Sequence, residues 1–583
     1  MSGCRLARAG RKGASMRSIA ALVLAVAAMS LLLAACGTKE VIVTQEVIQT
    51  VVVEKEVPVE KAVVQTVVVE KEVLATPTEA AMMEGKGPGN YGGDLRVVSQ
   101  ASIATLDPNF TGAYVTIAVS THIWDKPFAW DDDLNDAPAM VDTFSVSSDQ
   151  LTWTFKLRSG MKFHDGTGVT AEDAVASLQR WLGSWDAAAT FMREFVAEPA
   201  ATAVDNLTFE IHLKEPYGGT TVGLAKPWAS VFITPKGIAS KSSAEGLTLE
   251  EYVGAGPYKF STWDQGNKLT LVRFDDYVAD PRPTSLNAGT MYAYLDSITF
   301  LEIPDEETKI AGLETAEWDV VDGAGLDFYA RLTSNPDIVV PLYKPGHRTQ
   351  MDLIPSHPPF DNTVLRHALQ VGVDIEAWMA SLGPKELWQL CPAIYFCNAP
   401  WETDAGAEGY YNVHDIAMAK SLIAEAGYNG EVITWLNPTD YGTITPVGIV
   451  FKAQMEEMGI NIEMPANDWS TVIAKLGKPE DFDGFSNWAI HWCCGDPIVD
   501  VVSTGGAGYW PKIPKITRLR REWAAATDFA VKFDLIEQIQ EEAYKSVITL
   551  YGGNFFSIFP HRADLKGFTL KGMARYTNAH WEK

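Results

Sequence analysis

The feature that most constrains the fold is a repeated succession of an amphipathic helix, a glycine and a short apolar strand. The pattern from Asp415 to Ala426 predicts a helix, and Gly427 stands where a left-handed residue commonly ends one. At 445–458 apolar residues recur at helical spacing, Gly459 follows, and residues 460–464 alternate as a strand. Helices and strands in this succession predict an α/β architecture.

An earlier segment follows the same logic. Trp153, Phe155 and Leu157 alternate with polar residues, which predicts a strand. Thr170 then stands at a helix N-cap, and Asp173 follows three residues later, where the acid of a capping box belongs. We expect strand, turn and helix between 153 and 182.

The N-terminus predicts export from the cytoplasm. No acidic residue precedes Cys36, basic residues lead, and Ile19 to Ala35 is apolar apart from Ser30. This run is short for a membrane-spanning helix. Its end resembles the bacterial lipobox, in which the cysteine is lipidated and becomes the first mature residue. We expect residues 1–35 to be a signal peptide, with Met16 as an alternative start. Acyl chains on Cys36 would then hold the protein on the extracytoplasmic face of the cell membrane.

Residues 36–90 predict a stalk between lipid and folded part. The string QTVVVEKEV at 49–57 recurs at 65–73, sixteen residues later. Two copies are too few for a solenoid, which needs three or more repeats to bury a core. The β-branched content also disfavours a lone helix.

The length and net charge of the chain argue against a protein with a single hydrophobic core and against a nucleic-acid-binding protein. A chain of 583 residues exceeds one hydrophobic core and predicts two or more lobes. Without the five Lys and Arg residues of the leader, 42 basic residues face 74 acidic ones, a net charge of about −32. Such acidity argues against a nucleic-acid partner.

Four cysteines remain after the lipobox cysteine: Cys391, Cys397, Cys493 and Cys494. An oxidising compartment favours disulfides among them, and four cysteines allow three pairings. A bridge between the adjacent Cys493 and Cys494 would be strained. We therefore favour bridges between the two loops.

A series of motifs resembles the family 5 extracellular solute-binding proteins, the peptide, dipeptide and nickel receptors of ABC importers. The principal one is WTFKLRSGMKFHDGT at 153–167 followed by TAEDAV at 170–175. The others, in order, are LDP at 106–108, VGAGPY at 253–258, YLDSITF at 294–300, PPFDNTVLRHAL at 358–369, AKSLIAEAGY at 419–428, MGINIE at 458–463, DW at 468–469 and DP at 496–497. Each is weak alone, but the ordered set covers residues 91 to the C-terminus.

The resemblance implies a two-lobed periplasmic-binding-protein-like fold that closes over a ligand like a Venus flytrap. Lobe I would span 91–346, with an extra subdomain at about 126–249. Lobe II would span 347–551, and residues 552–583 would return to lobe I.

The resemblance also implies site residues. Peptide receptors of this family hold the ligand's α-amino group with an aspartate before a proline, which here is Asp496. They hold its carboxylate with a cation, usually an arginine of the same lobe, but none occurs between Arg366 and Arg518. The family position reads NPTDY at 437–441, with Tyr441 as a candidate contact. Oligopeptides therefore fit better than strict dipeptides.

Aromatic residues near Asp496 are further candidates. Trp488 and Trp492 approach it in sequence and could line a cleft for peptide side chains or stack on sugar rings. An oligosaccharide receptor is thus an alternative, and a nickel or metal-chelate receptor is another. His491 with the neighbouring cysteines could bind a soft metal, but disulfides compete for the thiols, and we assign no metal ligand.

The remaining expectations concern activity and partners. The HExxH, GxSxG, P-loop and CxxC motifs do not occur, so we expect no enzymatic activity and no cofactor. We expect a monomeric receptor that delivers its ligand to ABC permease subunits whose ATPases are separate chains. A surface hydrolase or a sensor module of the same fold is the rival hypothesis.

Overall fold

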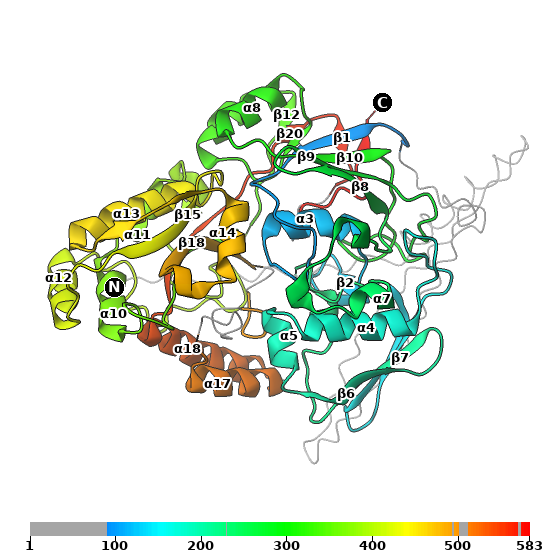
Figure 1. Cartoon of the computed structure of the whole chain (residues 1–583), viewed down its shortest axis with the longest axis horizontal. Helices are drawn as coiled ribbons and strands as arrows, with labels where there is room; N and C mark the ends of the chain where they lie inside the picture. The colour runs from blue at the N-terminus through cyan, green and yellow to red at the C-terminus, as the bar shows by residue number, and fades with distance from the viewer. Residues whose placement is uncertain are drawn as a thin grey trace, which may run out of the picture. The chain divides into compact units, whose positions relative to one another are not determined.

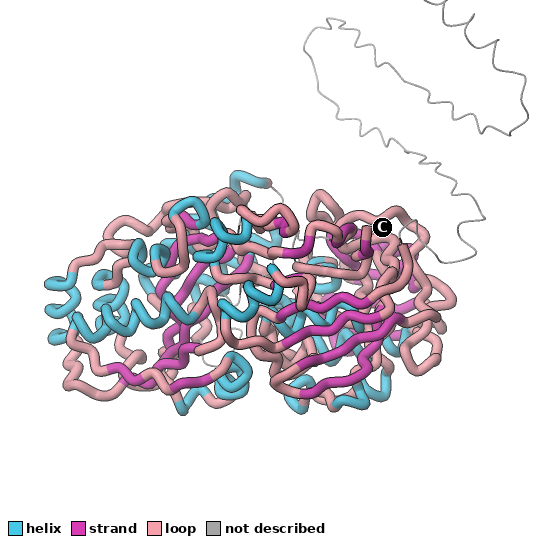
Figure 2. The backbone as a smooth tube through the Cα atoms, turned by 90° about the horizontal axis from the view of Figure 1, so that it is seen from above, coloured by secondary structure: helices cyan, strands magenta, loops and turns pink. Residues whose placement is uncertain are grey.

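Two seven-stranded sheets organise the chain in its computed structural model (Figure 1). The structure describes residues 90–228, 230–344, 346–491, 495–500, 511–526, 528–568 and 573–582. The predicted signal peptide, Cys36 and nearly all of the stalk lie outside these residues. Figure 2 separates the strands of the two sheets into two halves, which we call the first and second lobes. The α/β prediction and the two-lobed fold are confirmed.

The first sheet has the strand order β12-β20-β11-β1-β10-β9-β8. Its strands are β1 (Asp94–Val98), β8 (Tyr258–Asp264), β9 (Lys268–Arg273), β10 (Ser297–Leu301), β11 (Val320–Val321), β12 (Ile338–Val339) and β20 (His561–Arg562). Around it lie α3 (Tyr114–Ile123), α8 (Glu306–Glu314), α9 (Tyr329–Thr333) and the small pairs β2 (Phe128–Trp130) with β3 (Asp136–Pro138) and β21 (Leu565–Lys566) with β22 (His580–Trp581). The C-terminal segment therefore returns to the sheet that the N-terminal strand begins.

The second sheet has the order β14-β19-β13-β18-β15-β16, with β17 beside β15. Its strands are β13 (His347–Leu353), β14 (Trp388–Gln389), β15 (Ile433–Pro438), β16 (Ile462–Glu463), β17 (Ala466–Asn467), β18 (Gly484–Ile490) and β19 (Thr549–Phe555). Its helices are α10 (Thr363–Gly372), α11 (Ile375–Ala380), α12 (Ile416–Glu425), α13 (Thr445–Met458), α14 (Trp469–Leu476), α17 (Pro514–Ala525) and α18 (Phe529–Ser546). Met351 and Leu353 of β13 belong to the same hydrophobic core as Phe451 of α13, whereas Tyr551 of β19 and Ile536 of α18 belong to another core. The two faces of this sheet thus join different cores.

A four-stranded antiparallel sheet, β4-β5-β7-β6, lies between β3 and β8 in the chain. It comprises β4 (Val141–Val146), β5 (Thr152–Leu157), β6 (Val196–Ala203) and β7 (Thr208–Leu213), with α4 (Ala171–Leu182), α5 (Ala187–Met192), α6 (Val222–Ala225) and α7 (Lys236–Ala239). The sheet lies inside the predicted subdomain, although the exact bounds of subdomain and lobes stay predictions.

Local signals in the sequence predicted several element ends. Thr170 and Asp173 form the expected capping box at the start of α4. Asp415 caps α12 by accepting a hydrogen bond from Met418 N. Gly459 ends α13 at φ 92°, a left-handed conformation that glycine adopts without steric cost. Within the described residues, no helix combines the length and apolar character needed to cross a membrane.

Candidate functional site

A cavity of about 720 Å³ lies between the two lobes. Its first-lobe wall is formed by residues 109–113, 183–185, 228 and 243–244, and its second-lobe wall by residues of 469–487. This volume suits a small organic ligand. The structure places no ionisable side chain among the described residues that line it, and the larger ones are aromatic: Phe110, Trp185, Trp228, Trp469 and Phe485.

The first-lobe wall is held by a buried ion pair. Asp107 of the LDP motif contacts Arg180 of α4 at 2.5 Å, with both side chains almost fully buried. The other oxygen of Asp107 accepts a hydrogen bond from Asn109 N at 2.9 Å, which fixes the start of the lining segment. A buried charge-assisted pair with its remaining lone pairs satisfied holds a loop firmly.

Close packing brings the tryptophans onto this segment. Trp228 Nε1 donates to Gly112 O at 2.7 Å. A Cβ atom at position 112 would lie 2.3 Å from the Trp185 ring and 2.4 Å from the Trp228 ring, so only glycine fits there.

The second-lobe wall comes from α14 and β18. Asp468 caps α14 through Thr471 N, which places Trp469 at the first helical position. Asn487 of β18 donates from Nδ2 to Asp352 Oδ2 at 3.0 Å and is fixed by that bond.

Two indole groups of the cavity are unsatisfied. Trp185 Nε1 and Trp469 Nε1 are buried and have no hydrogen-bond partner in the structure. Both residues line the cavity, one from each lobe.

The structure brings Tyr441 and Trp488 together beside the cavity, although neither lines it. Their ring centroids are 6.0 Å apart, and Trp488 also contacts Tyr114 of the first lobe at 5.9 Å. Tyr441 Oη donates across the lobes to Gln100 Oε1 at 2.6 Å. These residues join the lobes at one edge of the cavity.

Asp496 is not among the residues that line the cavity. Its Oδ1 accepts hydrogen bonds from Ile498 N at 2.7 Å and Val499 N at 3.3 Å, so the carboxylate opens the turn after it. Burial raises its pKa above the ordinary value, while the nearby cations Arg520 and Lys226 oppose the shift. Trp492 lies outside the described residues.

The cysteine pairing differs from the expected bridges between loops. Cys391 is bonded to Cys397, six residues away in the same loop, with Cα atoms 5.8 Å apart. This separation lies at the ordinary value for a disulfide. The prediction was wrong because the loop folds back on itself, which cysteine spacing alone does not reveal. Cys493 and Cys494 lie outside the described residues.

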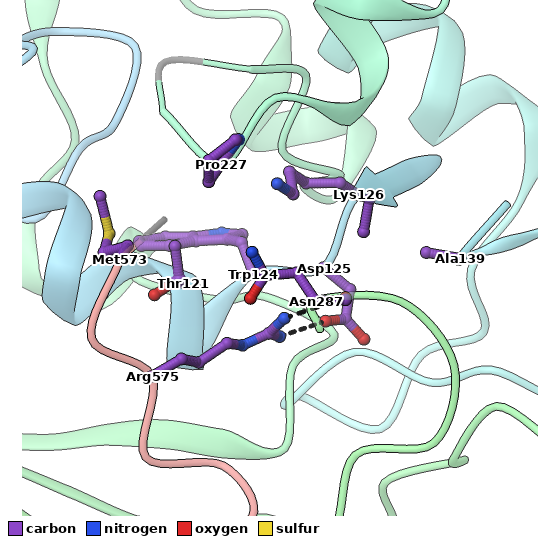
Figure 3. Close-up of a pocket in the computed structure, with 10 residues that line it drawn as sticks. Thr121, Trp124, Asp125, Lys126, Ala139, Pro227, Asn287, Met573 and Arg575 are labelled. Carbon is purple, nitrogen blue, oxygen red and sulfur yellow. Dashed lines mark hydrogen bonds and ion pairs between the residues drawn. The ribbon is translucent and has the colours of Figure 1, made fainter. Parts of the chain in front are cut away.

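A second pocket lies inside the first lobe and is too small for a solute (Figure 3). Its volume of about 20 Å³ holds roughly one water molecule. Arg575 faces Asp125 across it, with the two groups 3.5 Å apart. Lys126 donates to two backbone carbonyls, and burial lowers its pKa to about 7. These contacts are internal to the fold. Among the described residues, no three His, Cys, Asp or Glu side chains are grouped as metal ligands.

The sequence signals overlooked several of these residues. Trp185 lies in none of the motifs, and Trp469 belongs to the DW motif at 468–469, which carries the family resemblance but does not mark a ligand contact.

Two lobes around a shared cavity are the architecture of periplasmic binding proteins. The family model described as bacterial extracellular solute-binding proteins, family 5 middle, matches residues 137–497. The chain belongs to this family of substrate-binding receptors of ABC importers, which confirms the resemblance.

Proteins similar to this chain are associated with different ligands. The chain is 27% identical over 456 residues to a probable peptide ABC transporter periplasmic-binding protein, y4tO, of Sinorhizobium fredii, covering 76% of this chain and 84% of that protein. It resembles AgaA of A. tumefaciens R10 in complex with agropinic acid, with a TM-score of 0.72, 23% identity and coverage of 84% and 99%. It also resembles the oligopeptide-binding protein AppA of Bacillus subtilis in complex with a nonapeptide, with a TM-score of 0.72, 18% identity and coverage of 85% and 100%. At such identities the two structures establish the fold and leave the ligand open.

Proposed function

We propose that this protein is a lipid-anchored receptor of an ABC importer that captures oligopeptides between its lobes. The observation that supports this proposal most directly is the cavity of about 720 Å³, whose walls come from both lobes. Its uncharged lining suits the interior of a peptide, where backbone amides and side chains are neutral. The two ionised ends of a dipeptide would find no charged partner among the lining residues.

The unsatisfied indole groups support this proposal. Trp185 and Trp469 each offer a buried N–H, and peptide carbonyl oxygens are suitable acceptors. A ligand accepting from both would bind the two lobes at once and favour their closure. Asp496 anchors the α-ammonium in this proposal, while Tyr441 and Trp488 support the closed arrangement.

Closure of the two lobes over the ligand prepares the receptor to deliver that ligand to the permease. The closed receptor docks as a monomer on permease subunits, whose separate ATPases supply the energy, and it catalyses no reaction itself. A lipid on Cys36 keeps it at the extracytoplasmic surface. Acyl labelling in a bacterial host tests this anchor: the wild type incorporates label and Cys36→Ser does not. A labelled Cys36→Ser protein would contradict it.

Peptide capture is tested by calorimetry and small-angle scattering with peptides of two to eight residues. We expect tetrapeptides and longer peptides to bind more tightly than dipeptides and to reduce the radius of gyration. An unchanged radius at saturation would contradict closure, and a preference for dipeptides would contradict the length assignment. Incubated peptides should be recovered intact, since turnover would indicate a hydrolase.

An oligosaccharide receptor is the second candidate, because aromatic rings and neutral polar groups without ionisable side chains also suit sugar rings. Binding of neutral oligosaccharides in place of peptides, abolished by Trp469→Ala, would favour it.

A further inference from the structure

The ion pairs that join the two lobes are concentrated at one place. Arg521 of α17, in the second lobe, donates from Nη1 to Glu194 Oε2 at 2.9 Å and from Nη2 to Glu215 Oε1. Lys512 Nζ lies 3.5 Å from Glu194 Oε1. Glu194 follows α5 and Glu215 follows β7, so both acids belong to the first lobe. Within the described residues, no other ion pair joins the lobes.

The same contact places two guanidinium groups over aromatic rings of the first lobe. Cζ of Arg521 lies 4.7 Å from the ring centroid of Phe195, and Cζ of Arg520 lies 4.2 Å from that of Phe191. Phe191 is in α5, and Figure 1 shows α17 next to this helix. A cation within about 6 Å of a ring centroid is attracted to the face of the ring. Ion pairs and cation–π contacts therefore act together where α17 meets the first lobe.

Arg520 also fixes α17 to the second lobe. It is buried, and it donates from Nε to Pro497 O at 2.5 Å and from Nη2 to Ile498 O at 3.3 Å. Trp523 of α17 belongs to the same hydrophobic core as Ile536 of α18. Because the helix is held firmly within its own lobe, the contacts of Arg521 act between the two lobes as whole bodies.

The ion pairs of Arg521 are partly open to solvent, which makes them sensitive to salt. The side chains of Arg521, Glu194 and Glu215 are 36%, 27% and 44% exposed. The screening length falls from about 30 Å at 0.01 M salt to about 3 Å at 1 M, so salt weakens such pairs. A single exposed ion pair is weak. Here, however, one guanidinium joins carboxylates from two separate segments and also lies over a ring, which makes a network.

We infer that Arg521, Glu194 and Glu215 form an interlobe latch that favours the closed arrangement before a ligand enters, with a strength set by the surrounding salt concentration. None of the three residues lines the cavity, so the latch does not distinguish between ligands. The inference rests on the lobe closure of the proposed function, but it does not depend on the nature of the ligand.

Small-angle scattering of the full chain without ligand, at about 0.02 M and about 1 M NaCl, tests the latch. In low salt the wild type should have a smaller radius of gyration than Arg521→Met, because the variant's ratio of closed to open molecules should be about tenfold lower. In high salt the wild type should open and the two radii should converge.

Arg518→Met is the matched control. It removes the same charge from the same helix, at an exposed position whose partner Glu522 is also in α17. This variant should behave like the wild type. Equal radii for the wild type and Arg521→Met at both salt concentrations would overturn the inference, and so would equal opening in Arg518→Met.

A variant of the first lobe makes the test independent of the stability of α17. Glu194→Gln/Glu215→Gln should open the chain as much as Arg521→Met does. Combining all three substitutions should add no further opening, because they remove one shared contact. Additive opening would overturn the latch. A lower melting temperature in Arg521→Met, without opening in Glu194→Gln/Glu215→Gln, would assign Arg521 to the fold instead.

Failure of the peptide proposal has a different signature. If a tetrapeptide pool does not bind, but the wild type opens with salt and Arg521→Met does not respond, the latch stands and the peptide assignment is wrong. If the pool reduces the radius of gyration of both proteins equally while neither responds to salt, the peptide assignment stands and the latch is overturned.

Discussion

The two walls of the cavity differ in whether the buried charged groups behind them have partners. Behind the first-lobe wall every buried charge that positions it has a partner: Asp107 meets Arg180, and Lys226 contacts Asp186 at 2.6 Å. On the second-lobe sheet face, Arg348 retains open donors and Asn554 has no partner. The paired charges make the support of the first-lobe wall a rigid frame, although Trp185 Nε1 on that wall is unpaired, whereas the second-lobe face keeps unpaired donors in its interior. The comparison teaches which wall gives shape and which gives selectivity.

Breaking the ion pair between Asp107 and Arg180 should have the largest effect, and this effect is on the free energy of unfolding. Arg180→Met leaves Asp107 buried and unpaired, which costs about 3–5 kcal/mol in unfolding free energy. The double variant Asp107→Leu/Arg180→Met should be less destabilised than the single one, because no lone charge remains. Urea unfolding of both variants measures the difference. If Arg180→Met matched the wild type in stability, the pair would not be the support of this wall.

The next effect concerns ligand binding at Asp496. Asp496→Ala should weaken binding of a free-amine tetrapeptide by about 2–5 kcal/mol if the carboxylate pairs with its α-ammonium. N-acetylation of the peptide should weaken binding to the wild type by a similar amount and to the variant by much less. Calorimetry on the four combinations measures this coupling. Equal losses in both proteins would leave Asp496 as a turn residue only.

A pH dependence should report on the second-lobe face. Burial raises the pKa of Asp352 from 3.8 to about 6, against the hydrogen bonds that it accepts. The folded chain therefore holds this proton at pH values where the unfolded chain has lost it. Its contribution to stability should fall as pH rises from about 4 to about 6, by at most about 3 kcal/mol. Asp352→Asn should flatten this part of the profile in urea titrations, and an unaltered slope would count against it.

The smallest effect should be at the contact between the lobes. Tyr441→Phe removes the hydrogen bond to Gln100 but keeps the ring against Trp488. We expect a loss of about 1 kcal/mol in closure, seen as a roughly fivefold weaker affinity with an unchanged melting temperature. Small-angle scattering at partial saturation would show fewer closed molecules. Tyr410→Phe, outside this contact, is the control.

The fold was predictable because its signals are local. Caps such as Thr170 and Asp415 and stops such as Gly459 act within a few residues of the element that they end. The order of the motifs along the chain then indicated the protein family. The cavity was not predictable in the same way, since Gly112 and Asn487 are far apart in the chain and meet only through the tertiary fold. Whether a buried arginine is paired likewise depends on its partners across a sheet.

Gly112 controls the width of the cavity although it has no side chain with which to contact a ligand. A Cβ atom at this position would collide with the Trp185 and Trp228 rings, so the width of the first-lobe wall depends on one absent methyl group. Any residue but glycine would move two rings and with them the unsatisfied indole N–H of Trp185. A single substitution at the position of Gly112 would therefore change the shape of the cavity and the choice of ligand. The side chains that contact the ligand would remain the same residues.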